Sequence, residues 1–225
     1  MYPHELRVIN YSLIYSDIAI LHYYNAKTIY KRLADKWDPY QALEIQLPFF
    51  QHILIAVTFS QMAIESFIND YASACLSDAV FEDDFGSLNI VKKFQIVAMF
   101  LLHAEFDKSH SYYSLLKQLV KTRNDYVHNK SKKSDFQGYT LQEINEIHRI
   151  EKELNVNPTE PITNIREFKN QLAEARDAIK AIRDIALYFD KHDNQVYAIE
   201  RLLGPNGFPS SAHRIDVLKE LKVTT

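Results

Sequence analysis

The residues best suited to chemistry stand in one short stretch that begins at Arg123 and ends at His128. Helical spacing places Arg123 inside an apolar sector of its own helix. That sector is made by Leu116, Leu119, Val120, Tyr126 and Val127. A buried guanidinium costs several kcal/mol unless it meets a carboxylate, carbonyl groups, a ligand phosphate or solvent. The position of Arg123 therefore predicts a negatively charged or polar partner.

A polar, partly basic stripe lies beside this arginine on the same predicted helix. Its members are Lys117, Lys121, Asn124 and His128, at successive spacings of four, three and four residues, and Lys130 follows in the next loop. Arginine can grip two phosphoryl oxygens, and a histidine can donate or accept a proton near neutral pH. The stripe thus indicates phosphate chemistry. Helix physics alone favours a plainer interpretation, a surface helix end whose arginine is held by an acidic neighbour.

The composition predicts a soluble protein that stays in the cytoplasm. The hydrophobic share of 47% allows a substantial core, and four glycines and seven prolines are too few turn residues for a sheet-rich fold. The net charge of -3 means that any site for a polyanion has to be local. Cys75 is the only cysteine, which excludes an intrachain disulfide. The N-terminus has no signal-peptide pattern, so export is not expected.

The most apolar stretch, from Pro48 to Ile64, is short for a membrane span and contains polar residues. It favours a core helix, and no membrane association is expected. Long segments with helical period follow one another along the chain. We expect helices over about 5–37, 49–76, 88–103, 111–128, 141–154 and 165–189, and a short helix over about 212–221.

The segment 165–189 carries an apolar, heptad-like seam that either closes a bundle or supplies a dimer contact. Together the segments predict an all-α fold. We expect one antiparallel helical bundle over residues 1–195 and a peripheral C-terminal tail with a short helix over residues 196–225.

The six residues from Arg123 to His128, RNDYVH, resemble the Arg-x4-6-His signature of the HEPN superfamily. The resemblance includes the polar residue directly after the arginine. The segment from Ser60 to Asn69 is similar to a stretch with a glutamate and an asparagine in many members. The resemblance covers roughly residues 45–190 and implies a HEPN-like helical bundle with the motif toward the end of a late helix.

What the resemblance implies about activity is a metal-independent endoribonuclease that needs no cofactor. The ribose 2'-hydroxyl would attack the adjacent phosphate and leave a cyclic phosphate end. His128 would transfer protons, Arg123 would stabilise the charge on the phosphorane, and Asn124 would orient the site. Glu65 would be the partner that holds Arg123. RNA contacts are expected from Lys117, Lys121, Tyr126 and Lys130, although helical spacing makes core packing the default for an aromatic side chain.

The resemblance also implies partners. Two copies of the motif usually meet across a homodimer in HEPN ribonucleases, and a role as a toxin or in defence implies an antitoxin partner. A first alternative is a non-catalytic HEPN-like module in which the same residues bind RNA, a nucleotide or a partner protein. A second is a helical scaffold in which Arg123 is a structural ion pair. No metal site is expected, because His103, Glu105, Asp107 and His110 straddle a predicted turn.

Overall fold

The computed structural model describes residues 11–35, 39–128, 165–193, 197–204 and 212–222. Within these residues the protein is all-helical and has no strand. The predicted helix over 141–154 lies outside the described residues, as does Lys130. The helices are α1 (Tyr11–Asp35), α2 (Pro39–Cys75), α3 (Asp78–Val80), the π-helix η1 (Phe81–Phe85), α4 (Ile90–Ile96), the π-helix η2 (Val97–Leu101), α5 (Ser111–Val127), α7 (Ile165–His192), α8 (Ala198–Leu203) and α9 (Ala212–Glu220).

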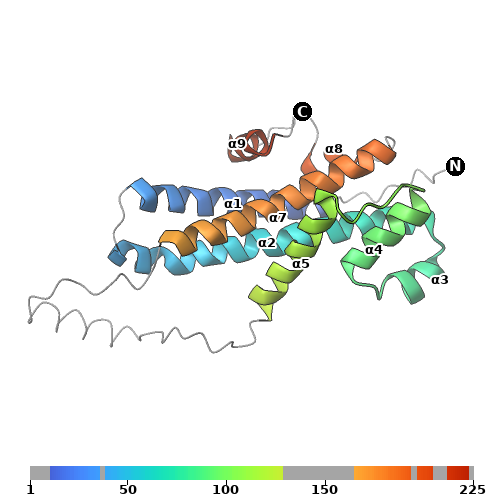
Figure 1. Cartoon of the computed structure of the whole chain (residues 1–225), viewed down its shortest axis with the longest axis horizontal. Helices are drawn as coiled ribbons and strands as arrows, with labels where there is room; N and C mark the ends of the chain where they lie inside the picture. The colour runs from blue at the N-terminus through green and yellow to red at the C-terminus, as the bar shows by residue number, and fades with distance from the viewer. Residues whose placement is uncertain (1–10, 36–38, 129–164, 194–196, 205–211, 223–225) are drawn as a thin grey trace, which may run out of the picture.

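The three longest helices, α1, α2 and α7, lie side by side along the long axis of the molecule (Figure 1). Helices α1 and α2 run antiparallel, because Tyr15 meets Phe59 and His22 meets His52. Residues later in α1 thus pack against residues earlier in α2. Alanine and serine on the buried face of α1, such as Ser16 and Ala19, allow close approach of its neighbours.

Helices α2 and α7 run parallel instead. Phe49 packs against Phe168 with ring centroids 4.8 Å apart, and further along both helices Phe67 packs against Phe189 at the same distance. The predicted all-α bundle is confirmed, but its helix pairs are of mixed direction. The apolar seam on α7 closes this bundle, since its members Ala175, Ile179, Ile182 and Ala186 are fully buried.

Helix α2 continues through Pro48, where the sequence placed a break. Proline lacks an N–H and so frees the carbonyl four residues earlier, which belongs to Glu44. Both residues are exposed, so water can bond to that carbonyl and the helix persists. By length and composition the stretch Glu44–Cys75 is able to cross a membrane, and 39% of its most apolar window is buried inside the protein. A core helix passes the same test.

The described part of the C-terminal tail packs into the bundle rather than lying at its periphery. The side chains of Leu202 and Val217 are fully buried. Ser16 Oγ donates to the carbonyl of Leu202, and Tyr23 Oη donates to Glu220 Oε1 at 2.9 Å. The short helix expected over 212–221 is α9, whereas α8 was not expected, because the proline and glycine residues that follow it made the whole tail resemble a loop.

Candidate functional site

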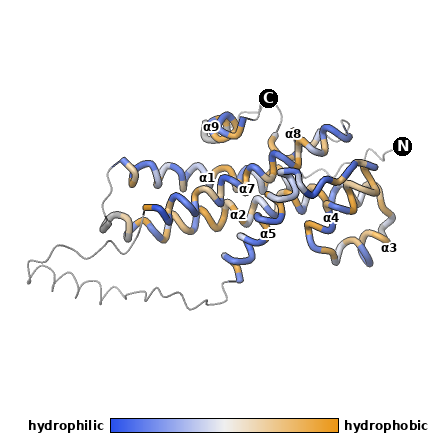
Figure 2. The backbone as a smooth tube through the Cα atoms, in the orientation of Figure 1, coloured by the Kyte–Doolittle hydropathy of each residue, from blue (hydrophilic) through white to orange (hydrophobic). Residues whose placement is uncertain are grey.

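Helix α5 carries the motif at its C-terminal end. Its packing stripe of Tyr112, Leu116 and Leu119 is buried against α2 and α7. Beyond Leu119 the helix becomes more hydrophilic toward its end (Figure 2). The helix ends at Val127, and the amide of the next residue, His128, still donates to a carbonyl of the last turn.

The structure brings Arg123, Asn124 and His128 together at this helix end. Arg123 Nη1 donates to Asn124 Oδ1 at 3.2 Å and lies 3.5 Å from His128 Nε2. A guanidinium has no acceptor atoms, so this contact is favourable when Nε2 of the imidazole carries no proton. Arg123 is half-buried, whereas Asn124 and His128 are exposed. The three groups therefore face solvent as one cluster, which we call the Arg123 cluster.

The expected ion pair between Glu65 and Arg123 is not formed. Glu65 on α2 instead pairs with Lys93 on α4, with Oε1 and Nζ 3.2 Å apart. Lys93 is only 3% exposed, so it needs this countercharge more than an arginine at the helix edge does. In the part of the chain that the structure describes, no carboxylate lies within ion-pair distance of Arg123.

Tyr126 lies between the arginine and the histidine in sequence but turns toward the bundle. Its hydroxyl donates to Glu174 Oε2 on α7, and its ring packs edge-on against Phe50, with centroids 5.4 Å apart. Burial and the neighbouring Glu174 carboxylate raise the pKa of the Tyr126 hydroxyl. Core packing, the default for this aromatic, is thus the arrangement that the structure has, rather than a ring open to a nucleobase.

The two described lysines that were predicted to contact RNA lie on the exposed side of α5. Lys117 and Lys121 are both exposed, and Lys117 Nζ lies 5.6 Å from the ring centre of Tyr113. They occupy successive turns that lead to Asn124, as the spacing predicted. The exposed carboxylate of Asp125 stands among these positive groups. The local charge at this helix end is therefore mixed, with a modest excess of positive groups.

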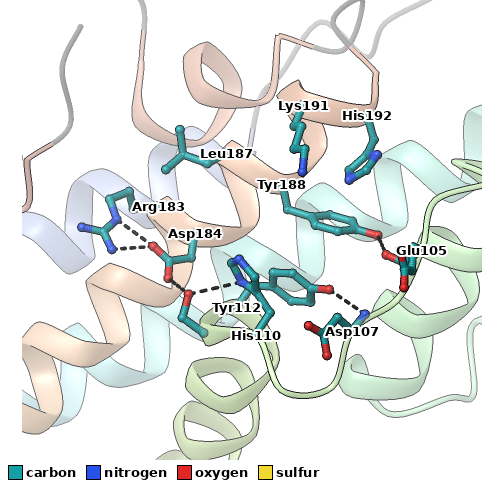
Figure 3. Close-up of a pocket in the computed structure, with 11 residues that line it drawn as sticks. Glu105, Asp107, His110, Tyr112, Arg183, Asp184, Leu187, Tyr188, Lys191 and His192 are labelled. Carbon is teal, nitrogen blue, oxygen red and sulfur yellow. Dashed lines mark hydrogen bonds and ion pairs between the residues drawn. The ribbon is translucent and has the colours of Figure 1, made fainter.

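A cleft of about 460 Å³ lies at the other end of α5, roughly 25 Å from the motif along the helix (Figure 3). It lies between the loop before α5 and the C-terminal half of α7. The imidazole of His110 stacks on Tyr112, and Asp184 accepts hydrogen bonds from Ser111 and Arg183. No residue of the Arg123 cluster lines it. The sequence did not indicate this cleft, because its two walls are far apart in the chain, with 73 positions between Ser111 and Asp184, and neither wall carries a motif.

A second arrangement that the sequence did not indicate is the histidine pair between α1 and α2. The Nδ1 atoms of His22 and His52 lie 2.9 Å apart. Burial and the opposite histidine lower the pKa of His22, and burial lowers the pKa of His52. Among the described residues no three His, Cys, Asp or Glu side chains are grouped so that they could hold a metal ion.

In comparisons with known proteins, no family model, curated protein or solved structure matches this chain. The class that the structure defines is an all-helical bundle that presents an arginine, an asparagine and a histidine at the exposed end of one helix.

Proposed function

We propose that this chain is a HEPN-like endoribonuclease that cleaves RNA without a metal ion. One observation carries the proposal: Arg123 lies 3.5 Å from His128 Nε2, and no described carboxylate pairs with it. A guanidinium and an imidazole at this spacing suit a phosphodiester, because one can neutralise the phosphoryl oxygens while the other transfers a proton.

The proposed reaction is an internal transfer within RNA. The 2'-oxygen forms a bond to the adjacent phosphorus, the bond from phosphorus to the 5'-oxygen breaks, and a 2',3'-cyclic phosphate remains. His128 Nε2 takes the proton of the 2'-hydroxyl, because a phosphodiester bound by the guanidinium of Arg123, 3.5 Å away, would come within its reach. Arg123 stabilises the negative charge that grows on the phosphorane, and Asn124 holds the arginine through its amide oxygen.

A second proton has to reach the leaving 5'-oxygen, and each chain offers one motif histidine. We therefore include a homodimer in the proposal, with the second copy supplying the second imidazole. Asn124, Val127 and His128 are exposed, so no described part of the chain covers them against contact with another chain. The same exposure would let an inhibitory antitoxin cover the site, which fits a role as a toxin or in defence. Lys117 and Lys121 would bind flanking phosphates of the RNA.

The decisive experiment incubates purified protein with a fluorescent RNA oligonucleotide and excess EDTA. We expect cleavage to products that end in a 2',3'-cyclic phosphate, identified by mass spectrometry. The His128→Ala variant should lose at least about a hundredfold in rate. The matched control is His110→Ala, which removes an exposed histidine at the opposite end of the same helix. Equal cleavage by wild type and His128→Ala would refute the catalytic assignment.

A non-catalytic binding module is the second candidate, and one observation favours it. The Arg123 cluster stands at an exposed helix end and does not line the cleft of Figure 3, so the described residues of one chain do not enclose a substrate at this cluster. In that case the arginine and the lysines bind RNA or a nucleotide without turnover. The expected result is that Arg123→Ala abolishes RNA binding in fluorescence anisotropy, while no product forms with wild-type protein.

A further inference from the structure

The last turn of α5 has little tertiary support of its own. In the described structure, Asn124, Asp125, Val127 and His128 are all exposed. Tyr126 is the member of this turn that reaches the rest of the bundle. Helix ends fray when their side chains make few tertiary contacts. The position of the motif histidine thus depends on how firmly Tyr126 is anchored.

The anchor consists of one hydrogen bond and one ring contact. The hydroxyl of Tyr126 donates to Oε2 of Glu174, and its ring lies edge-on to Phe50 at 86°. Glu174 projects from α7, which packs against α1, α2, α5 and α8. Hydrogen bonds to a carboxylate are shorter and stronger than those between neutral groups. Glu174 therefore ties the end of α5 to a long helix that packs against four others.

The contact between Arg123 and His128, which this anchor would preserve, tolerates little movement. Arg123 Nη1 and His128 Nε2 are already 3.5 Å apart, the outer limit of a hydrogen bond. They lie on either side of Tyr126 along the helix. An unwinding or rotation of the last turn carries the imidazole away while Arg123 stays with the packed part of α5. Displacement by about 1 Å at a reacting group can cost up to a hundredfold in rate.

From this geometry we infer that Glu174 is a positioning residue, which acts through Tyr126 to fix His128 beside Arg123. The inference rests on the proposed function for its catalytic consequence. It assigns a role to an acidic residue of α7 that stands 48 positions from Tyr126 in the sequence. It also gives Tyr126 a role in place of base stacking. Neither residue touches the substrate in this arrangement.

The activity test compares Tyr126→Phe, Glu174→Leu and Glu174→Gln with wild type. The first two remove the hydrogen bond and should lower kcat about tenfold with an unchanged KM, because RNA contacts stay in place. Glu174→Gln keeps an acceptor oxygen and should restore most of kcat. The double variant Tyr126→Phe/Glu174→Leu should be no slower than either single variant. The matched control is Tyr112→Phe, which removes another hydrogen-bonded hydroxyl of α5 far from the motif.

A second readout does not need activity. Amide hydrogen exchange should show faster exchange at His128 N, which donates to Asn124 O at 2.9 Å, in Tyr126→Phe and Glu174→Leu but not in Tyr112→Phe. If wild type cleaves no RNA, the proposed function fails and the exchange rates alone decide the anchor. Unchanged exchange and kcat in Glu174→Leu would overturn the inference. An equal loss in Tyr112→Phe would also overturn it, since the effect would then be one of general stability.

Discussion

Arg123 and His128 meet at the exposed end of α5, with Nη1 and Nε2 3.5 Å apart, while the described structure provides no carboxylate for the guanidinium. An arginine in a packing stripe needs negative charge or solvent. Here solvent supplies part of that need, because Arg123 is half-exposed. The guanidinium can still accept an anion, so the proposed phosphodiester could bind at this helix end. A structural ion pair would already have used that capacity.

The first prediction therefore concerns Arg123→Ala. Loss of an arginine that pairs with no described carboxylate should change the melting temperature by less than about 2 °C. If Arg123 has its proposed role of stabilising the phosphorane, its loss should lower RNA cleavage at least about a hundredfold. Differential scanning fluorimetry and the oligonucleotide assay measure the two effects. A drop of more than about 5 °C with unchanged RNA binding would favour the scaffold interpretation.

The long helices and the proximity of the Arg123 cluster residues could both be predicted from the sequence, and for the same reason. A helix places residues four positions apart on one face, so the spacing of Asn124 and His128 already implies that they are neighbours. Arg123 precedes Asn124 directly, and its long side chain reaches both of them. In the same way, the apolar seam of α7 indicated which of its residues are buried. These are local relationships within one helix. The long helices were predicted correctly wherever no proline intervened.

Contacts between different helices could not be predicted from residue spacing. The pairs Lys93 with Glu65 and His22 with His52 depend on how separate helices pack, which the spacing within one helix does not set. Glu65 was assigned to Arg123 because only the motif arginine had been recognised as needing a partner. Lys93, almost fully buried on α4, has the stronger electrostatic need.

The second prediction concerns pH. Burial lowers the pKa of His22 and His52 below 6.5 in the folded chain. As the pH falls, the histidines of the unfolded chain bind protons before those of the folded chain do. The free energy of unfolding is therefore highest above pH 6.5 and decreases as the pH drops below that value. Urea unfolding at about pH 7.5 and about pH 5 should show a smaller loss for the His22→Leu/His52→Leu variant than for wild type. A His110→Leu control should retain the wild-type loss.

The third prediction concerns the buried lysine on α4. Glu65→Ala leaves the ammonium of Lys93 without its ion pair and should lower the free energy of unfolding by about 1 to 3 kcal/mol. The cost is below that of a fully enclosed pair, because the Glu65 side chain is 37% exposed. Lys93→Met removes the charge and should stay within about 1 kcal/mol of wild type. Urea titrations decide this, and a harmless Glu65→Ala would mean that Lys93 reaches solvent.

The last prediction tests whether the C-terminal helices belong to the core. Leu202 on α8 is fully buried, and its carbonyl accepts a hydrogen bond from Ser16 on α1. Leu202→Ala should therefore lower the free energy of unfolding by about 2 to 4 kcal/mol, through lost apolar burial and the cavity left behind. Ile215→Ala on α9 is the control, since that side chain is 42% exposed and should cost less than about 1 kcal/mol. Equal, small losses at both positions would mean that the tail is peripheral, as its turn-rich sequence suggested.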